Sequence, residues 1–202
     1  MDYTTLDIVK RRLGESGTGN DIDITATINA ACRAIDSWTQ RSFGLTALES
    51  REFEVLEATK PAYRWHHGRP YVLDIPDIVV SDDMTVQYRE SVSHSVVPWP
   101  THESHYDFLP ITPRPRWPRT QIRFGHHFEQ DDRIVLTATW GWPEVPAEVK
   151  YAAALYSTRL FRRFDSPLGI TGNPDFGKVY VSKLDPDIEA LLKVFKKRLR
   201  IA

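Results

Sequence analysis

The sequence predicts an α+β protein with a helical-bundle core of about four helices, a central antiparallel β insertion, and a C-terminal arm and helix. Near both ends of the chain, apolar residues recur every three or four positions, which is the helical period. Between Glu49 and Trp142 they alternate with polar residues, which is the period of strands. We therefore expect residues 1–48 and 143–202 to form the helical core with its arm and last helix, and residues 49–142 to form the β-rich insertion.

Two helices are expected before the insertion. Thr4 is a suitable N-cap for a short first helix, which Gly14 ends. A second helix is expected from Asp23 to Gln40, and its apolar stripe includes Cys32. A thiol on that stripe is expected to be buried and inert, and a single cysteine excludes an internal disulfide framework.

The insertion contains runs of alternating or β-branched residues that predict strands. These runs are Arg51–Glu57, Tyr71–Asp74, Ile78–Val80, Thr85–Tyr88, Tyr106–Leu109, Gln121–Phe124 and Arg133–Thr139. Prolines concentrate between residues 90 and 120. Because proline cannot donate a ladder hydrogen bond, we expect loops, edges and turns in that part of the insertion.

A structural corner is expected where the insertion rejoins the helical core. Its residues are Trp140, Gly141, Trp142 and Pro146. The two tryptophans are expected to pack in the hydrophobic core at the sheet-to-helix junction. Proline is favoured in the first turn of a helix, so Pro146 predicts the start of a third helix from about Pro146 to Arg163.

A last helix is expected after Asp185-Pro186, with an apolar stripe that runs to Leu199. Its basic residues and one aromatic residue are the candidate interface with an acidic partner or with nucleic acid in a channel: Lys193, Phe195, Lys196, Lys197, Arg198 and Arg200. The basic side chains fit an acidic partner or nucleic acid, or else a solvated helix face opposite the stripe.

Residue patterns for catalysis and metal binding are weak. The histidine pairs at 66–67 and 126–127 lack the i, i+4 spacing of a zinc helix, and the Asp doublets at 82–83 and 131–132 fit ordinary turns. We find no nucleophile elbow and no phosphate loop. The sequence therefore predicts no catalytic residue, no metal site and no cofactor.

Composition limits the partners. The formal net charge of −1 gives no overall attraction to nucleic acid or to an anionic membrane. The apolar runs are too short to cross a bilayer, and the N-terminus lacks signal-peptide features. We expect a soluble protein that is made in a cytoplasm and does not contact a membrane. One function that the residues allow is a carbohydrate- or peptide-binding module that uses Trp65, Trp99 and Trp117 on β-region loops. A metal-dependent hydrolase built on the histidines is a weaker alternative.

The order of these elements resembles a known family, the head-to-tail connector or adaptor proteins of long-tailed bacteriophages, and most closely the versions in phages of actinobacteria. Four segments carry the resemblance: Tyr3–Leu6; Ala30–Asp36 with Thr39, Arg41 and Phe43; Val72–Asp77; and Thr139–Trp142 with Val145-Pro146. The loop from Glu90 to Pro118 departs from the family by its length and its content of proline and histidine.

The resemblance implies a non-enzymatic virion protein at the neck, the head–tail interface. It implies a ring of identical subunits, a dodecamer, beneath the portal protein. The ring would extend the DNA channel toward a stopper or tail-terminator protein and would contact double-stranded DNA without sequence specificity. It also implies contact between the C-terminal region and the portal.

Overall fold

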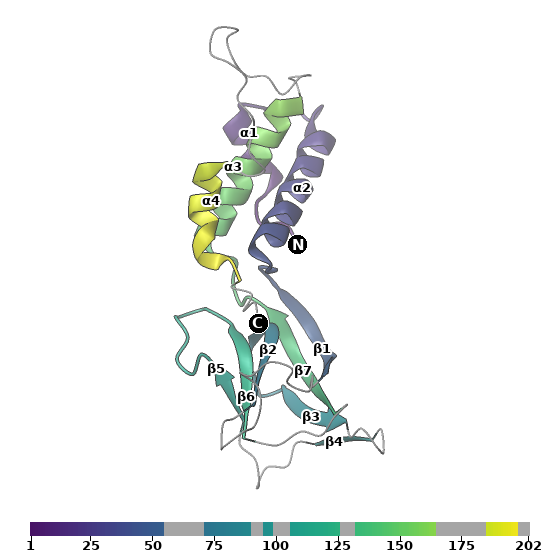
Figure 1. The fold of residues 1–202 in the computed structure, drawn as a ribbon. Coiled ribbons are helices and arrows are strands. Elements are labelled where there is room, and N and C mark those ends of the chain that lie inside the picture. Colours follow the sequence, from purple (N-terminus) through teal and green to yellow (C-terminus); the bar gives the residue numbers. More distant parts are fainter. Residues whose placement is uncertain (55–70, 90–94, 99–105, 126–131, 165–184, 198–202) are drawn as a thin grey trace. The chain divides into compact units, whose positions relative to one another are not determined.

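The computed structural model describes residues 1–54, 71–89, 95–98, 106–125, 132–164 and 185–197. The chain divides into two compact units, one of Met1–Phe43 with Val145–Leu199 and one built on Gly44–Glu144. Among the described residues, four α-helices belong to the first unit and an antiparallel sheet of seven strands belongs to the second (Figure 1). The predicted α+β class is confirmed.

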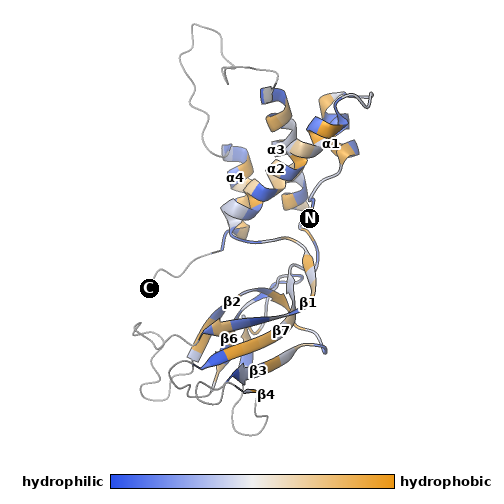
Figure 2. Cartoon of the chain, turned by 90° about the vertical axis from the view of Figure 1, so that its right-hand side faces the viewer, coloured by the Kyte–Doolittle hydropathy of each residue, from blue (hydrophilic) through white to orange (hydrophobic). Residues whose placement is uncertain are grey.

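The helical unit is built from α1 (Leu6–Leu13), α2 (Asp21–Thr39), α3 (Ala147–Phe164) and α4 (Pro186–Leu192). Helix α2 packs against α3, α1 packs against both, and α4 packs against α3 (Figure 1). Its fully buried core includes Val9, Ile24, Ile35, Val149 and Ile188. The alternation of hydrophobic and hydrophilic residues along each helix in Figure 2 is the amphipathic pattern that such packing requires.

The helix ends differ in detail from the prediction. Thr5, not Thr4, occupies the N-cap position of α1. The Thr4 side chain is buried and its hydroxyl has no hydrogen-bond partner among the residues that the structure describes, so its position follows from packing rather than capping. Gly14 ends the helix as expected, with φ +76°, a left-handed conformation that glycine adopts without steric cost.

The predicted long C-terminal helix is wrong. Helix α4 ends at Leu192 and continues as a 3-10 turn, η2 (Lys193–Phe195), after which Lys196 is extended. Tertiary contacts explain this end. The ring of Phe195 lies edge-on to Phe43 at 5.7 Å, and the backbone N–H of Lys197 donates to the carbonyl of Thr39 at 2.8 Å. The chain therefore leaves its helical path to pack against the C-terminal end of α2.

The sheet unit contains β1 (Leu45–Glu54), β2 (Tyr71–Val79), β3 (Thr85–Arg89), β4 (Val96–Pro98), β5 (Tyr106–Leu109), β6 (Arg119–Phe124) and β7 (Arg133–Gly141). Strand order is β4-β3-β7-β2-β6-β5, and β1 pairs with β7. Figure 2 shows hydrophobic residues along β7. Buried residues of four strands, β2, β3, β6 and β7, form the core of this unit: Ile75, Ile78, Val86, Ile122, Phe124, Ile134, Leu136, Ala138 and Trp140.

Two differences from the predicted strands concern prolines. The runs at Tyr71–Asp74 and Ile78–Val80 form one strand, β2, whose pairing with β6 shifts register between Asp74 and Ile78, so the irregularity accommodates Pro76. The short strand β4 was not predicted. It pairs with β3 at the end of the strand order, and a position at an edge is compatible with Pro98.

Candidate functional site

The predicted corner lies at the end of β7, within the sheet unit. Trp140 is 1% exposed, and its indole N–H donates to the carbonyl of Glu49 at 3.0 Å. Trp142 is equally buried, and its indole N–H donates to the Asp77 carboxylate at 2.8 Å. Gly141, between them, has φ +107°, which strongly favours glycine. Both rings are therefore fixed by packing and by hydrogen bonds to neighbouring strands.

The corner also joins the two ends of the insertion. Gly141 is opposite Leu45 in the β1–β7 ladder, and the backbone N–H of Trp142 donates to the carbonyl of Gly44 at 3.3 Å. Pro146 follows, and its carbonyl accepts the N–H of Lys150 at 3.0 Å, the first helical hydrogen bond of α3. The prediction for Pro146 was therefore one residue early, because the helix proper begins at Ala147.

The C-terminal candidate residues lie after α4 rather than along it. Lys193 and Lys196 are exposed, and the ammonium of Lys196 lies 4.7 Å from the centre of the Trp38 ring. Phe195 is 4% exposed, and its carbonyl accepts a hydrogen bond from Arg41 at 2.6 Å. Phe195 is thus a packing residue of the helical unit. Arg198 and Arg200 lie outside the described residues.

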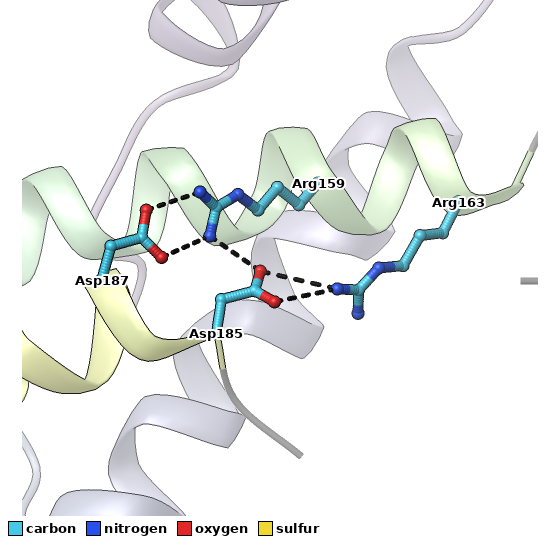
Figure 3. Close-up of polar contacts among 4 residues, drawn as sticks. All are labelled: Arg159, Arg163, Asp185 and Asp187. Atoms are coloured by element: carbon cyan, nitrogen blue, oxygen red, sulfur yellow. Dashed lines mark hydrogen bonds and ion pairs between the residues drawn. The ribbon is translucent and has the colours of Figure 1, made fainter. Parts of the chain in front are cut away.

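An ion-pair network, not predicted from the sequence, joins α3 to the start of α4 (Figure 3). Arg159 donates to both carboxylate oxygens of Asp187 and, at 2.7 Å, to Asp185, while Arg163 donates to Asp185 at 3.2 Å. The hydrogen bonds from Arg159 lower the pKa of the Asp187 carboxyl. Both acids also lie at the N-terminal end of α4, where the helix dipole favours negative charge.

A second network ties the N-terminal segment to α2. The hydroxyl of Tyr3 donates to Asp36 and accepts the backbone N–H of Phe43 at 2.9 Å. Burial and the hydrogen bond to Asp36 raise the pKa of the Tyr3 phenol. Cys32 is fully buried, and burial raises the pKa of its thiol. The predicted inert thiol agrees with this environment.

A basic loop between β5 and β6 was also missed. Its arginines are Arg114, Arg116 and Arg119, the last of which is also the first residue of β6, in the run Pro113-Arg-Pro-Arg-Trp-Pro-Arg119. Trp117 lies with its ring centre 5.0 Å from that of Trp142, and the Arg114 guanidinium lies 5.2 Å from the Trp117 ring centre. Three arginines within six residues were a visible sequence signal. The proline content of the region drew the interpretation toward loops instead.

The described residues contribute little to the other candidate chemistries. All seven histidines, together with Asp131, Trp65 and Trp99, lie outside them. Asp82 and Asp83 form the predicted turn, in which the N–H of Met84 donates to the carbonyl of Ser81 at 3.2 Å. Within the described ranges no group of three or more His, Cys, Asp or Glu residues could hold a metal ion, and no helix is long and apolar enough to span a membrane.

Trp117 is the one described member of the proposed aromatic binding surface. It is half-buried and packs against Trp142, which gives its ring a structural role. Nothing in the described residues adds support for a carbohydrate- or peptide-binding module.

Comparison with known proteins gives a likeness of fold. No protein-family model and no curated protein match this sequence. A solved structure, described as "Neck of empty GTA particle computed with C6 symmetry", contains a chain that aligns with a TM-score of 0.54 at 12% identity. The alignment covers 98% of this chain and 91% of that chain. The two proteins therefore share a fold over nearly their whole length.

Proposed function

We propose that this chain is a structural, non-enzymatic neck protein of a phage-like virion, a head-to-tail connector. The observation that carries the proposal is the likeness of fold, over nearly the whole chain, to a protein in the neck of a GTA particle, GTA standing for gene transfer agent. That likeness agrees with the connector resemblance of the Tyr3, Ala30–Asp36 and Thr139–Trp142 segments. Fold and sequence pattern thus support the same role. They also support the proposal that the chain is one of the connectors of long-tailed phages.

The proposed assembly is a homo-oligomeric ring. The related neck was computed with C6 symmetry, and a dodecamer is compatible with that symmetry because its subunits divide into six equal pairs. Closure of such a ring needs two unlike, complementary surfaces on each subunit. The proposed ring lies beneath the portal protein, contacts a stopper or tail-terminator protein on its other side, and surrounds the DNA channel.

Reconstitution with the cognate portal protein tests this proposal. Purified chain mixed with portal should form ring-shaped complexes in negative-stain images, and mass photometry should show a discrete mass with a fixed number of subunits. A connector can be monomeric until it meets its portal, so the portal must be present. A chain that stays monomeric and leaves the portal mass unchanged would contradict the proposal.

The exposed lysines after α4 are proposed to contribute to contact with the portal or with DNA. Lys193 and Lys196 are both exposed, and Lys196 is held over Trp38. The variant Lys193→Glu/Lys196→Glu should weaken portal binding, whereas Arg11→Glu/Arg162→Glu reverses two exposed charges of the same unit and should not. Equal binding by both variants would remove the lysines from the proposed surface.

A further inference from the structure

We infer that the β5–β6 loop binds the phosphate backbone of double-stranded DNA without reading its sequence. The inference rests on the proposed function for the source of that DNA. It starts from charge: residues 110–119 contain three arginines and no acidic residue, in a chain whose formal net charge is −1. This segment therefore carries a local excess of positive charge in a chain that has none overall.

Two of the three guanidinium groups have no anionic partner among the described residues. Arg114 is exposed, and its guanidinium lies over the face of the Trp117 ring. Arg119 is partly buried, and its Nη1 atom is fully buried with no hydrogen-bond partner in the described part of the chain. A charged donor that is removed from water without an acceptor is costly. An anion that approaches the exposed part of this guanidinium offsets part of that cost.

The third guanidinium, that of Arg116, is paired with a carboxylate that a phosphate can displace. Arg116 donates to the Glu144 carboxylate at 2.8 Å, but the two side chains are 77% and 53% exposed. An ion pair this exposed contributes little, so a phosphate can replace Glu144 as the partner of Arg116.

The loop is also held in one conformation before any partner arrives. Pro113, Pro115 and Pro118 restrict its backbone, and the N–H of Trp117 donates to the carbonyl of Arg114 at 2.9 Å. Arg116 has φ +64°, a left-handed conformation that is uncommon for a residue other than glycine. Packing of Trp117 on Trp142 anchors this turn to the corner. A pre-ordered loop loses little conformational entropy on binding.

The side chains fit double-stranded DNA better than single-stranded nucleic acid. All three basic residues are arginines, whose planar guanidinium matches phosphate oxygens. Single-stranded nucleic acid would require an open aromatic face for base stacking. The one aromatic side chain of the loop, Trp117, instead lies against Trp142 and carries Arg114 over its ring. Contact with phosphates, rather than bases, is the mode that this arrangement supports.

Fluorescence anisotropy with a short mixed-sequence DNA duplex tests the inference, with a salt titration for each variant. Arg114→Ala/Arg119→Ala should weaken binding about tenfold and reduce the slope of log affinity against log salt by about 2, roughly 0.9 per lost phosphate contact. Glu144→Gln should strengthen binding because it releases Arg116. The matched control Arg11→Ala/Arg162→Ala removes two exposed charges from the helical unit and should leave affinity and slope unchanged.

The exposed single variant Arg114→Ala gives the same direction at about half the change in slope if the double variant fails to fold. Wild-type protein that does not bind the duplex, or loop variants that bind like the control, would overturn the inference. Equal competition by polyglutamate would also overturn it, in favour of an acidic protein partner. Portal assembly is measured on the same variants. Intact assembly with unchanged DNA binding refutes the loop inference alone, whereas loop-dependent DNA binding without assembly refutes the proposed neck function.

Discussion

Replacement of Arg159 by alanine should loosen α4 from α3 without detaching it. Arg159 is the centre of the network in Figure 3, because it bonds both Asp185 and Asp187. The side chains of Arg159, Asp185 and Asp187 are 32%, 19% and 53% exposed. The network is therefore partly screened by solvent, and it lies between a surface ion pair and a buried one.

The magnitude follows from that exposure. A solvent-exposed ion pair contributes about 1 kcal/mol or less, and paired geometry to two carboxylates raises this to about 2 kcal/mol in total. Burial of Ile188, Leu192 and Phe195 contributes about 2 kcal/mol for each side chain. The apolar contacts therefore exceed the ionic ones by about threefold on these estimates. Arg159→Ala should lower the local opening free energy of α4 by about 2 kcal/mol, and Ile188→Ala should lower it further.

Amide hydrogen exchange of α4 measures this quantity directly. Arg162→Ala is the matched control, because Arg162 is an exposed residue of α3, the helix that also carries Arg159. The pKa of Asp187 is lowered from its ordinary value of 3.8, so its contribution is present above pH 3.8 and is lost as pH falls through the lower folded-state value. The difference between wild type and Arg159→Ala should shrink in acid. Equal α4 exchange in Arg159→Ala and Arg162→Ala at neutral pH would refute this reasoning. So would a difference between wild type and Arg159→Ala that grows in acid.

Two further changes test the buried hydrogen bonds. Tyr3→Phe should cost about 2 kcal/mol at neutral pH, because Asp36 and the N–H of Phe43 each lose a partner. The raised pKa of Tyr3 adds stability that is fully present below the ordinary value of 10.0 and is lost as pH rises through the folded-state value. The difference in unfolding free energy between wild type and Tyr3→Phe should therefore narrow in alkali, and denaturant titrations at several pH values measure it. Trp142→Phe should cost about 2 to 3 kcal/mol by the same measurement, and a cycle with Asp77→Leu should give a coupling of about 1 to 2 kcal/mol; no coupling would contradict the assigned bond.

Local periodicity was enough to predict most elements. The expected strand Tyr106–Leu109 has the same first and last residues as β5. Helix α2 begins at Asp21, two residues before the expected Asp23. These elements are encoded in neighbouring residues. The end of α4 is different, because the apolar spacing continues to Leu199 while the helix stops at Leu192. That stop depends on Phe43 and Thr39, which are distant in sequence.

The candidate sites show the same limit. The run of arginines in the β5–β6 loop is visible in the sequence, but the partners that orient it, Trp142 and Glu144, are not adjacent to it. Arg159 and Asp185 are separated by 26 positions, and neither residue has a local pattern that predicts the other. Sequence periodicity identifies which face of an element is apolar, whereas pairing between charged side chains requires the tertiary structure.

The adjacent ends of the insertion have an evolutionary consequence. Because Gly44 and Trp142 share a backbone hydrogen bond, the residues at the start and end of the sheet unit lie side by side although they are far apart in sequence. The strands of such a unit can lengthen, shorten or be replaced in related chains without moving its two attachment points. Those points stay one strand spacing apart, about 5 Å. Such modularity allows the loops of the sheet unit to diverge toward new partners without disturbing the helical packing.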